Sequence, residues 1–230
     1  MSQGFLIPSG DVTITKLSEP PLREMSIDEL LKISSVDSSA SDHIADWRKA
    51  NYDNLHRGVE KIAIAQEHEI PHMYGRLWIQ TVDKNGDVHD YGLASLRCVT
   101  TAAVNAMVEV MNGTTPASTA LTVWKYHALG TGTNAEATSD TALQTELTTQ
   151  YSTDNTRPTG SQTVGATNNV YRTAATITVD ASVALTEHGI FNQAAVGGGI
   201  LLDRTVFAVV NLSSGESFVG RYDFLIAAGG

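Results

Sequence analysis

Four segments in the second half of the chain most constrain what it can fold into. Each is rich in β-branched or aromatic residues and is bounded by Gly, Asn, Asp or Ser, the pattern of a strand between turns. They are residues 121–129, 170–179, 201–212 and 217–226. Four or more strands at this spacing are typical of an antiparallel β-sandwich or barrel. The sequence therefore predicts a mainly β fold.

A hairpin and one helix precede these segments. Residues 73–82 alternate apolar and polar side chains, and Asn85-Gly86 is the signal of a tight turn, so a strand, a turn and a second strand are predicted up to about residue 96. Thr101 is expected to cap a buried helix over residues 102–111. The polar, mostly uncharged stretch 148–168 is predicted to be a long surface loop.

The first 72 residues have a different character, which predicts a boundary between a region 1–72 and a β-sandwich domain 73–230. Residues 1–21 contain too few apolar groups to fold alone and are expected to form an extended arm. A capping-box pattern predicts a short helix at 26–34, and apolar residues at helical spacing predict an amphipathic helix at about 41–66. The apolar stripe of this helix needs a cover, which either the β body or a neighbouring subunit supplies.

Charge and cysteine content limit the classes of partner. The 15 basic and 25 acidic residues give a formal net charge of -10, which repels a phosphate backbone, so nucleic acid is not expected as a partner. Cys98 is the single cysteine, which allows no internal disulfide, and it is expected to be a small core residue at the start of a helix. No run approaches the roughly 18 apolar residues of a membrane span, and no signal peptide is recognisable. We expect a soluble chain from a reducing compartment, without a membrane partner.

The segment from His68 to His72 matches the H-E-x-x-H motif, in which two histidines one helical turn apart bind zinc. Pro71 lacks a backbone donor and disfavours helix at the residue before it, so the two histidines are not expected to share a helical face. The pattern instead predicts the end of a helix and the start of a strand.

Four other patterns are also interpreted structurally. The segment Asp83–Asp87 begins like a calcium loop, but position twelve is Ala94 where a glutamate is needed, so a hairpin turn is predicted. Gly130–Asn134 lacks the third glycine and the following helix of a dinucleotide-binding loop and the Gly-Lys-Ser/Thr of a P-loop, so a sharp turn is predicted there. Gly197–Gly199 is also predicted to be a turn. Glu187-His188 is expected in an exposed turn between strands. The chain is therefore not expected to be an enzyme, and no catalytic, cofactor-binding or metal-binding residue is assigned.

The order of motifs in the β region carries a resemblance. Gly-Thr-Gly-Thr at 130–133 is followed by Asp-Thr-Ala-Leu-x-x-Glu at 140–146, Thr-Glu-His-Gly-Ile-Phe at 186–191, and Asp-Arg-Thr-Val-Phe at 203–207. This series resembles a β-sandwich module of virion proteins in tailed bacteriophages, over about residues 93–228. Ala103 stands where such proteins usually have a glycine at the start of the helix.

The resemblance implies a structural role in the virion, without cofactor or catalysis. We expect a capsid decoration or cement protein, synthesised in the host cytoplasm, that binds the major capsid protein or other virion proteins on the outer surface of the head. A homotrimer or homodimer is expected, with residues 1–72 contacting neighbours. The alternatives are a tail, neck or baseplate component, or a fibre module in which the loop 148–168 and Tyr151 bind host glycans.

Overall fold

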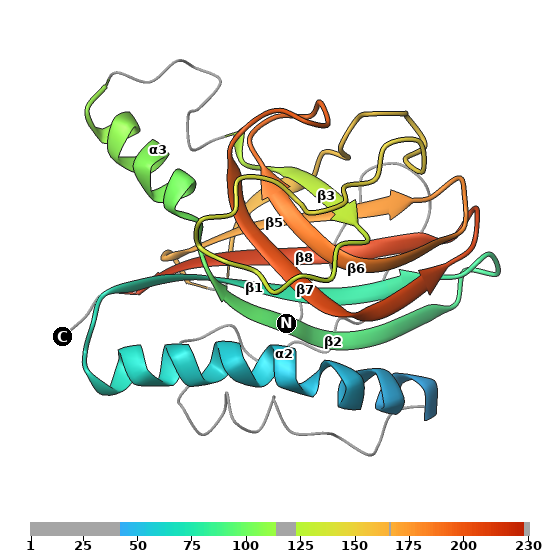
Figure 1. The fold of residues 1–230 in the computed structure, drawn as a ribbon, viewed down its shortest axis with the longest axis horizontal. Helices are drawn as coiled ribbons and strands as arrows, with labels where there is room; N and C mark the ends of the chain where they lie inside the picture. The colour runs from blue at the N-terminus through green and yellow to red at the C-terminus, as the bar shows by residue number, and fades with distance from the viewer. Residues whose placement is uncertain (1–41, 114–122, 166, 228–230) are drawn as a thin grey trace.

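The computed structural model describes residues 42–113, 123–165 and 167–227. Two antiparallel sheets form the body, one with the strand order β2-β1-β8-β5-β4 and the other β3-β6-β7 (Figure 1). The elements are α2 (Asp42–Glu67), β1 (His72–Val82), β2 (Val88–Cys98), α3 (Thr101–Met111), β3 (Tyr126–Gly130), β4 (Ser161–Val164), β5 (Val170–Thr178), β6 (Val183–Phe191), β7 (Leu201–Leu212) and β8 (Ser217–Ala227). The predicted mainly β, antiparallel fold is confirmed.

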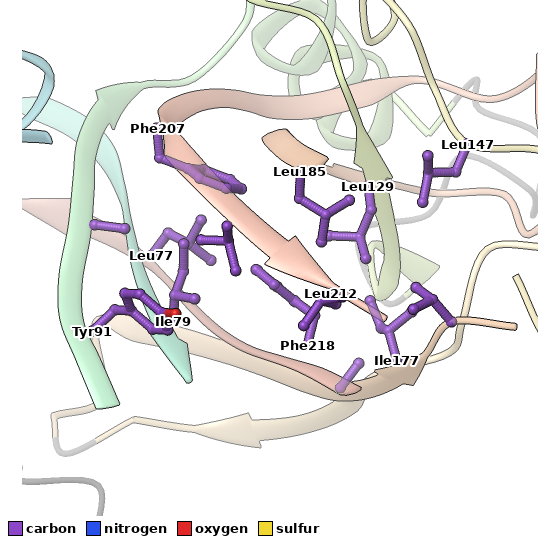
Figure 2. Close-up of a cluster of buried hydrophobic side chains, with 14 of the residues drawn as sticks. Leu77, Ile79, Tyr91, Leu129, Leu147, Ile177, Leu185, Phe207, Leu212 and Phe218 are labelled. Atoms are coloured by element: carbon purple, nitrogen blue, oxygen red, sulfur yellow. The ribbon is translucent and has the colours of Figure 1, made fainter. Parts of the chain in front are cut away.

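The main core lies between the two sheets. Alternate residues of each strand point to one face of its sheet, so the inner faces supply a largely apolar layer. Figure 2 shows Leu77 and Ile79 of β1 and Phe218 of β8 meeting Leu185 of β6 and Phe207 of β7, and all five are buried. This packing fixes the register of both sheets, because a slip of one residue would turn every apolar side chain outward.

The helix α2 agrees with the predicted amphipathic helix at 41–66, and the β body itself covers its apolar stripe. Ile44 and Trp47 belong to the main core, and α2 packs along β2 and β7 (Figure 1). Asn51 joins these two strands: its Nδ2 donates to the Ala94 carbonyl at 2.8 Å, and its Oδ1 accepts from the Ala208 N–H at 2.9 Å. One buried side chain thereby satisfies backbone groups of both sheets where they meet.

The stretch predicted as a surface loop at 148–168 is exposed over much of its length, as predicted, but part of it closes the body on another side and forms β4. Thr159 pairs with Tyr126 of β3, and the Gly160 N–H donates to the carbonyl of Lys125, just before β3, at 2.7 Å. The chain then continues into β4 of the other sheet. Tyr151 is buried, and its hydroxyl accepts from the Leu129 N–H at 2.8 Å. Tyr151 and β4 were missed because the polar residues around them favour a loop, while their own hydrogen-bond partners lie elsewhere in the chain.

Most predicted strands are present with adjusted bounds. The hairpin is confirmed, with Gly86 at a φ of +87°, and the strands predicted at 170–179, 201–212 and 217–226 correspond to β5, β7 and β8. The strand predicted at 121–129 is represented by β3 from Tyr126, while residues 121 and 122 lie outside the described residues. The strands β4 and β6 were not predicted. The arm at 1–21 and the helix at 26–34 also lie outside the described residues.

Two details of α3 correct the sequence analysis. Thr100, not Thr101, is the N-cap: its hydroxyl accepts from the Ala103 N–H at 3.1 Å and donates to the Leu201 carbonyl. The helix is also buried on one face only, because Val108 and Met111 on it are 52% and 82% exposed. Cys98 is the last residue of β2, not the first of the helix.

Candidate functional site

Glu187 and His188 lie inside strand β6 and are fully buried, so the predicted exposed turn is wrong. β6 is the middle strand of its sheet, between β3 and β7. A strand covered on both faces shows no alternation of apolar and polar residues, and polar groups on it must find partners inside the protein. The polar residues of β6 form the centre of an extended side-chain network.

The Glu187 carboxylate accepts four hydrogen bonds. Its Oε1 accepts from the backbone N–H groups of Gly132 at 3.0 Å and Thr145 at 2.7 Å. Its Oε2 accepts from the backbone N–H of Gln144 at 3.0 Å and from Nε of Arg204 at 2.8 Å. Because every lone pair of this buried carboxylate has a donor, the charge is compensated where water cannot reach it.

Arg204 extends the network from β7 to the segment that follows β3. Its Nη1 pairs with Asp140 Oδ2 at 3.1 Å, and its Nη2 donates to the Asn134 carbonyl at 3.1 Å. Asp140 in turn accepts from the Ala137 N–H at 2.9 Å, and Gln144 Oε1 accepts from the N–H groups of residues 133 and 134. The irregular segment 131–147 is thus held to the sheet mainly by side chains, with one isolated backbone bridge between Glu146 and Gly130 of β3.

The glycines of the Gly130–Asn134 pattern are explained by this network. A Cβ atom on Gly130 would lie 2.5 Å from Glu187 Oε1, and one on Gly132 would lie 2.6 Å from the same oxygen and 2.5 Å from Gln144 Cβ. Neither glycine leaves room for a side chain. The backbone N–H of Gly132 already bonds to a carboxylate, whose negative charge would repel a phosphate.

A second ion pair anchors the turn after β6. Arg157 is 1% exposed and pairs with Glu146 through Nε–Oε1 at 2.5 Å and Nη2–Oε2 at 2.9 Å. Its Nη1 donates to the carbonyls of Gln193 and Gly198, and its guanidinium lies 3.5 Å from the Phe191 ring centroid. The predicted turn at residues 197–199 is confirmed by φ angles of +80° and +84° at its outer glycines.

Two histidines meet between the sheets. His127 Nδ1 lies 3.0 Å from His188 Nε2, and His127 Nε2 lies 3.0 Å from the Thr173 hydroxyl, within a fully buried group. Burial lowers the pKa of His127 to about 3. Burial, and then the charge of His127, hold the pKa of His188 well below its usual range. Both rings are therefore neutral near pH 7 and link the strands by hydrogen bonds.

Asp203 and Tyr222 form another buried pair, with the Tyr222 hydroxyl donating to Asp203 Oδ2 at 2.9 Å. Burial raises the pKa of Asp203 to about 7 and the pKa of Tyr222 well above its usual value. A carboxyl group with a raised pKa is often found at active sites. Here the carboxyl group is 2% exposed and faces the hydroxyl of a fully buried tyrosine, so we interpret the pair as a hydrogen bond that stabilises the fold.

The H-E-x-x-H segment does not lie on one helix. The helix α2 ends at Glu67, Glu69 has a φ of +53°, and β1 begins at His72, whose Nδ1 is 2.7 Å from the Ile70 carbonyl. The segment therefore joins a helix to a strand, as predicted. Within residues 42–113, 123–165 and 167–227, no group of three or more His, Cys, Asp or Glu side chains is arranged to hold a metal ion.

The turn Asp83–Asp87 uses its first carboxylate internally. Asp83 Oδ1 accepts from the backbone N–H groups of Asn85 at 2.8 Å and Asp87 at 2.9 Å. The hydrogen bond from the Asp87 backbone, the largest cause, lowers the pKa of Asp83. These bonds close the hairpin between β1 and β2, the role predicted for the segment.

The charged groups around Glu187 bond to backbone groups and to each other, and so hold distant segments of the chain together. We call this network the clamp at Glu187. It joins β6, β7 and the segment 131–147, which lie far apart in the sequence. From the sequence, these residues were recognised as an ordered series of motifs but not as partners in one network. The available signal was a run of charged and polar residues, Thr186-Glu187-His188 and Asp203-Arg204-Thr205, within otherwise apolar strand segments.

Fold and site together define an antiparallel, mainly β protein with a sandwich-like body held by buried polar networks. No protein-family model, curated protein or solved structure matches the chain. Neither α2 nor α3, the helices of the described residues, is long and apolar enough to cross a membrane.

Proposed function

We propose that this chain is a structural protein of a tailed-bacteriophage virion, and specifically a decoration protein that binds the outer surface of the head. It would stabilise the shell by contacting the major capsid protein or other virion proteins, as a homotrimer or homodimer. The proposal starts from the resemblance of the ordered motifs between residues 130 and 207 to virion β-sandwich modules.

One observation supports it most. The motifs at 130–133, 140–146, 186–191 and 203–207 contribute the residues that meet around Glu187. In this chain the pattern therefore encodes a buried clamp between strands and loops. A pattern that specifies a clamped scaffold fits a protein whose task is to keep its shape on a particle.

The physical properties of the chain are compatible with the outside of a shell. Its net charge of -10 would be repelled by packaged DNA, and the clamps at Glu187 and Arg157 secure segments that pair with other strands only through isolated bridges. We place the contacts with neighbouring subunits in the N-terminal region, of which α2 already packs on the body. The glycan-binding alternative loses its support, because Tyr151 is buried and β4 lies in the expected loop.

Cryo-electron microscopy of particles that contain this chain tests the proposal directly. Density at regular lattice positions over the head is the expected result. Density confined to the neck, tail or baseplate would replace the decoration role with a tail role, and absence from every particle would refute the virion proposal.

A binding assay gives a second test with purified components. Shells assembled without this protein are mixed with the full chain and sedimented, and the bound fraction and the resistance of the shells to heat and osmotic shock are measured. We expect saturable binding that raises resistance. The heat-denatured chain is the control, and equal pelleting of both forms would show that the binding is non-specific.

A further inference from the structure

An apolar groove lies beside α3 at one edge of the five-stranded sheet. It has a volume of about 520 Å³ and is lined chiefly by Met107, Trp124, Val164, Tyr171, Phe224 and Ile226. Val164 is 67% exposed and Ile226 is 52% exposed. Exposed apolar side chains that line one concave surface mark a binding site more often than scattered ones do.

The groove adjoins an open strand edge. β4 is the last strand in its sheet, pairs with β5 on one side, and has no strand of the described residues on the other. Residues 162–164 of β4 are exposed, and Val164 is also part of the groove wall. An open edge offers backbone N–H and C=O groups to an added strand, while the groove offers space for its apolar side chains. The surface therefore fits an extended apolar segment.

Trp124 places a hydrogen-bond donor in the wall of the groove. Its side chain lines the groove, and its indole Nε1 is buried with no hydrogen-bond partner among the described residues. A buried donor without an acceptor is unfavourable. A peptide carbonyl brought to this wall would supply the acceptor, which an aliphatic ligand would not.

We propose that residues 5–15 of the same chain occupy the groove and extend the sheet at β4. Residues 5–7 are Phe-Leu-Ile, residues 12–15 alternate Val-Thr-Ile-Thr, and Asp11 is the one charged residue of the segment. This composition matches a groove whose lining residues are all uncharged. The proposal does not rest on a virion role.

The connection is long enough. Residues 15 and 42 are 27 positions apart, which spans up to about 90 Å when extended. The 26-residue helix α2 is about 39 Å long, so the segment can pass along the body from the start of α2. Attachment to the same chain also gives the segment an effective concentration on the order of millimolar, which favours docking in the same molecule over capture of a free partner.

Hydrogen–deuterium exchange on the full chain tests the proposal. We expect amides of residues 5–15 to exchange at least about tenfold more slowly than an unstructured peptide. Val164→Asp places a charge in the groove wall and should remove this protection. Val209→Asp is the matched control, because Val209 is 48% exposed on β7 and does not line the groove; it should leave the protection intact. Circular dichroism and the melting temperature establish that both variants are folded.

A second variant tests whether Val164→Asp acts through the groove or through an indirect effect on the fold. Ile14→Asp changes the proposed occupant and not the groove, so it should release residues 5–15 and increase exchange in β4. Exchange of residues 5–15 at the unstructured rate would overturn the proposal, as would protection that survives Val164→Asp. Protection that appears only at high concentration, together with a dimer in light scattering, would show a second copy in the groove and overturn docking within one molecule.

Discussion

Replacing Glu187 by glutamine is the sharpest test of the clamp. The substitution keeps the shape of the side chain but converts one carboxylate oxygen into an NH₂ group. In the native protein each oxygen accepts from two donors: Oε1 from Gly132 and Thr145, and Oε2 from Gln144 and Arg204. Whichever way the amide turns, two buried donors then face another donor.

The magnitude follows from these contacts. A buried donor left without an acceptor costs about 1–3 kcal/mol, so two of them cost about 2–6 kcal/mol. Arg204 also loses the charge of Glu187 but keeps Asp140 at 3.1 Å, which moderates the penalty of about 3–5 kcal/mol expected for breaking a buried ion pair. We expect the free energy of unfolding to fall by about 3–5 kcal/mol, and the melting temperature by about 6–20 °C.

Urea denaturation followed by circular dichroism measures this loss. Glu216→Gln is the matched control, because Glu216 accepts one hydrogen bond, from the Ser213 N–H, in a partly exposed turn; we expect a loss below about 1 kcal/mol. Combining Glu187→Gln with Arg204→Gln should cost less than the sum of the two single changes. A loss below about 1 kcal/mol for Glu187→Gln would refute the clamp.

Four further predictions follow from the site. Gly132→Ala should lower the free energy of unfolding by about 1–3 kcal/mol in urea denaturation, because its Cβ would overlap two neighbours. Because His127 and His188 have lowered pKa values, the unfolded state binds more protons below its pKa of about 6.5; stability should fall as the pH drops from about 6.5 towards 3, and His188→Gln should flatten that slope in unfolding at stepped pH values. The raised pKa of Asp203 acts oppositely: the folded state holds a proton between about 4 and 7, so Asp203→Asn should gain stability relative to the native protein as the pH rises through this window. Dialysis against a chelator should not change the melting temperature, and stoichiometric zinc that is lost on His72→Ala would return the metalloenzyme interpretation.

Local chemistry explains which elements were predictable. The helix at 42–67 and the strands β5, β7 and β8 have side chains whose own periodicity or branching favours one backbone conformation, whatever lies nearby. The hairpin at Asn85-Gly86 is equally local, because Gly86 must adopt a positive φ. The bonds of the helix and of the hairpin form between neighbours in the sequence or across a tight turn. The strands β5 and β8 pair with distant strands, but their extended conformation is favoured by their own side chains.

The sequence by itself thus determined the mainly β class, the amphipathic helix and the interruption of helix before Pro71. Only the tertiary structure decided that Glu187 and His188 are buried and that the segment containing Tyr151 is folded. Glu187 accepts from backbone N–H groups 42 to 55 positions away, and Tyr151 bonds to Leu129, 22 positions away. The sequence does not show whether the hydrogen-bonding groups of a polar side chain are paired with water or with the backbone of a distant segment. Its burial is fixed only when those distant partners come together.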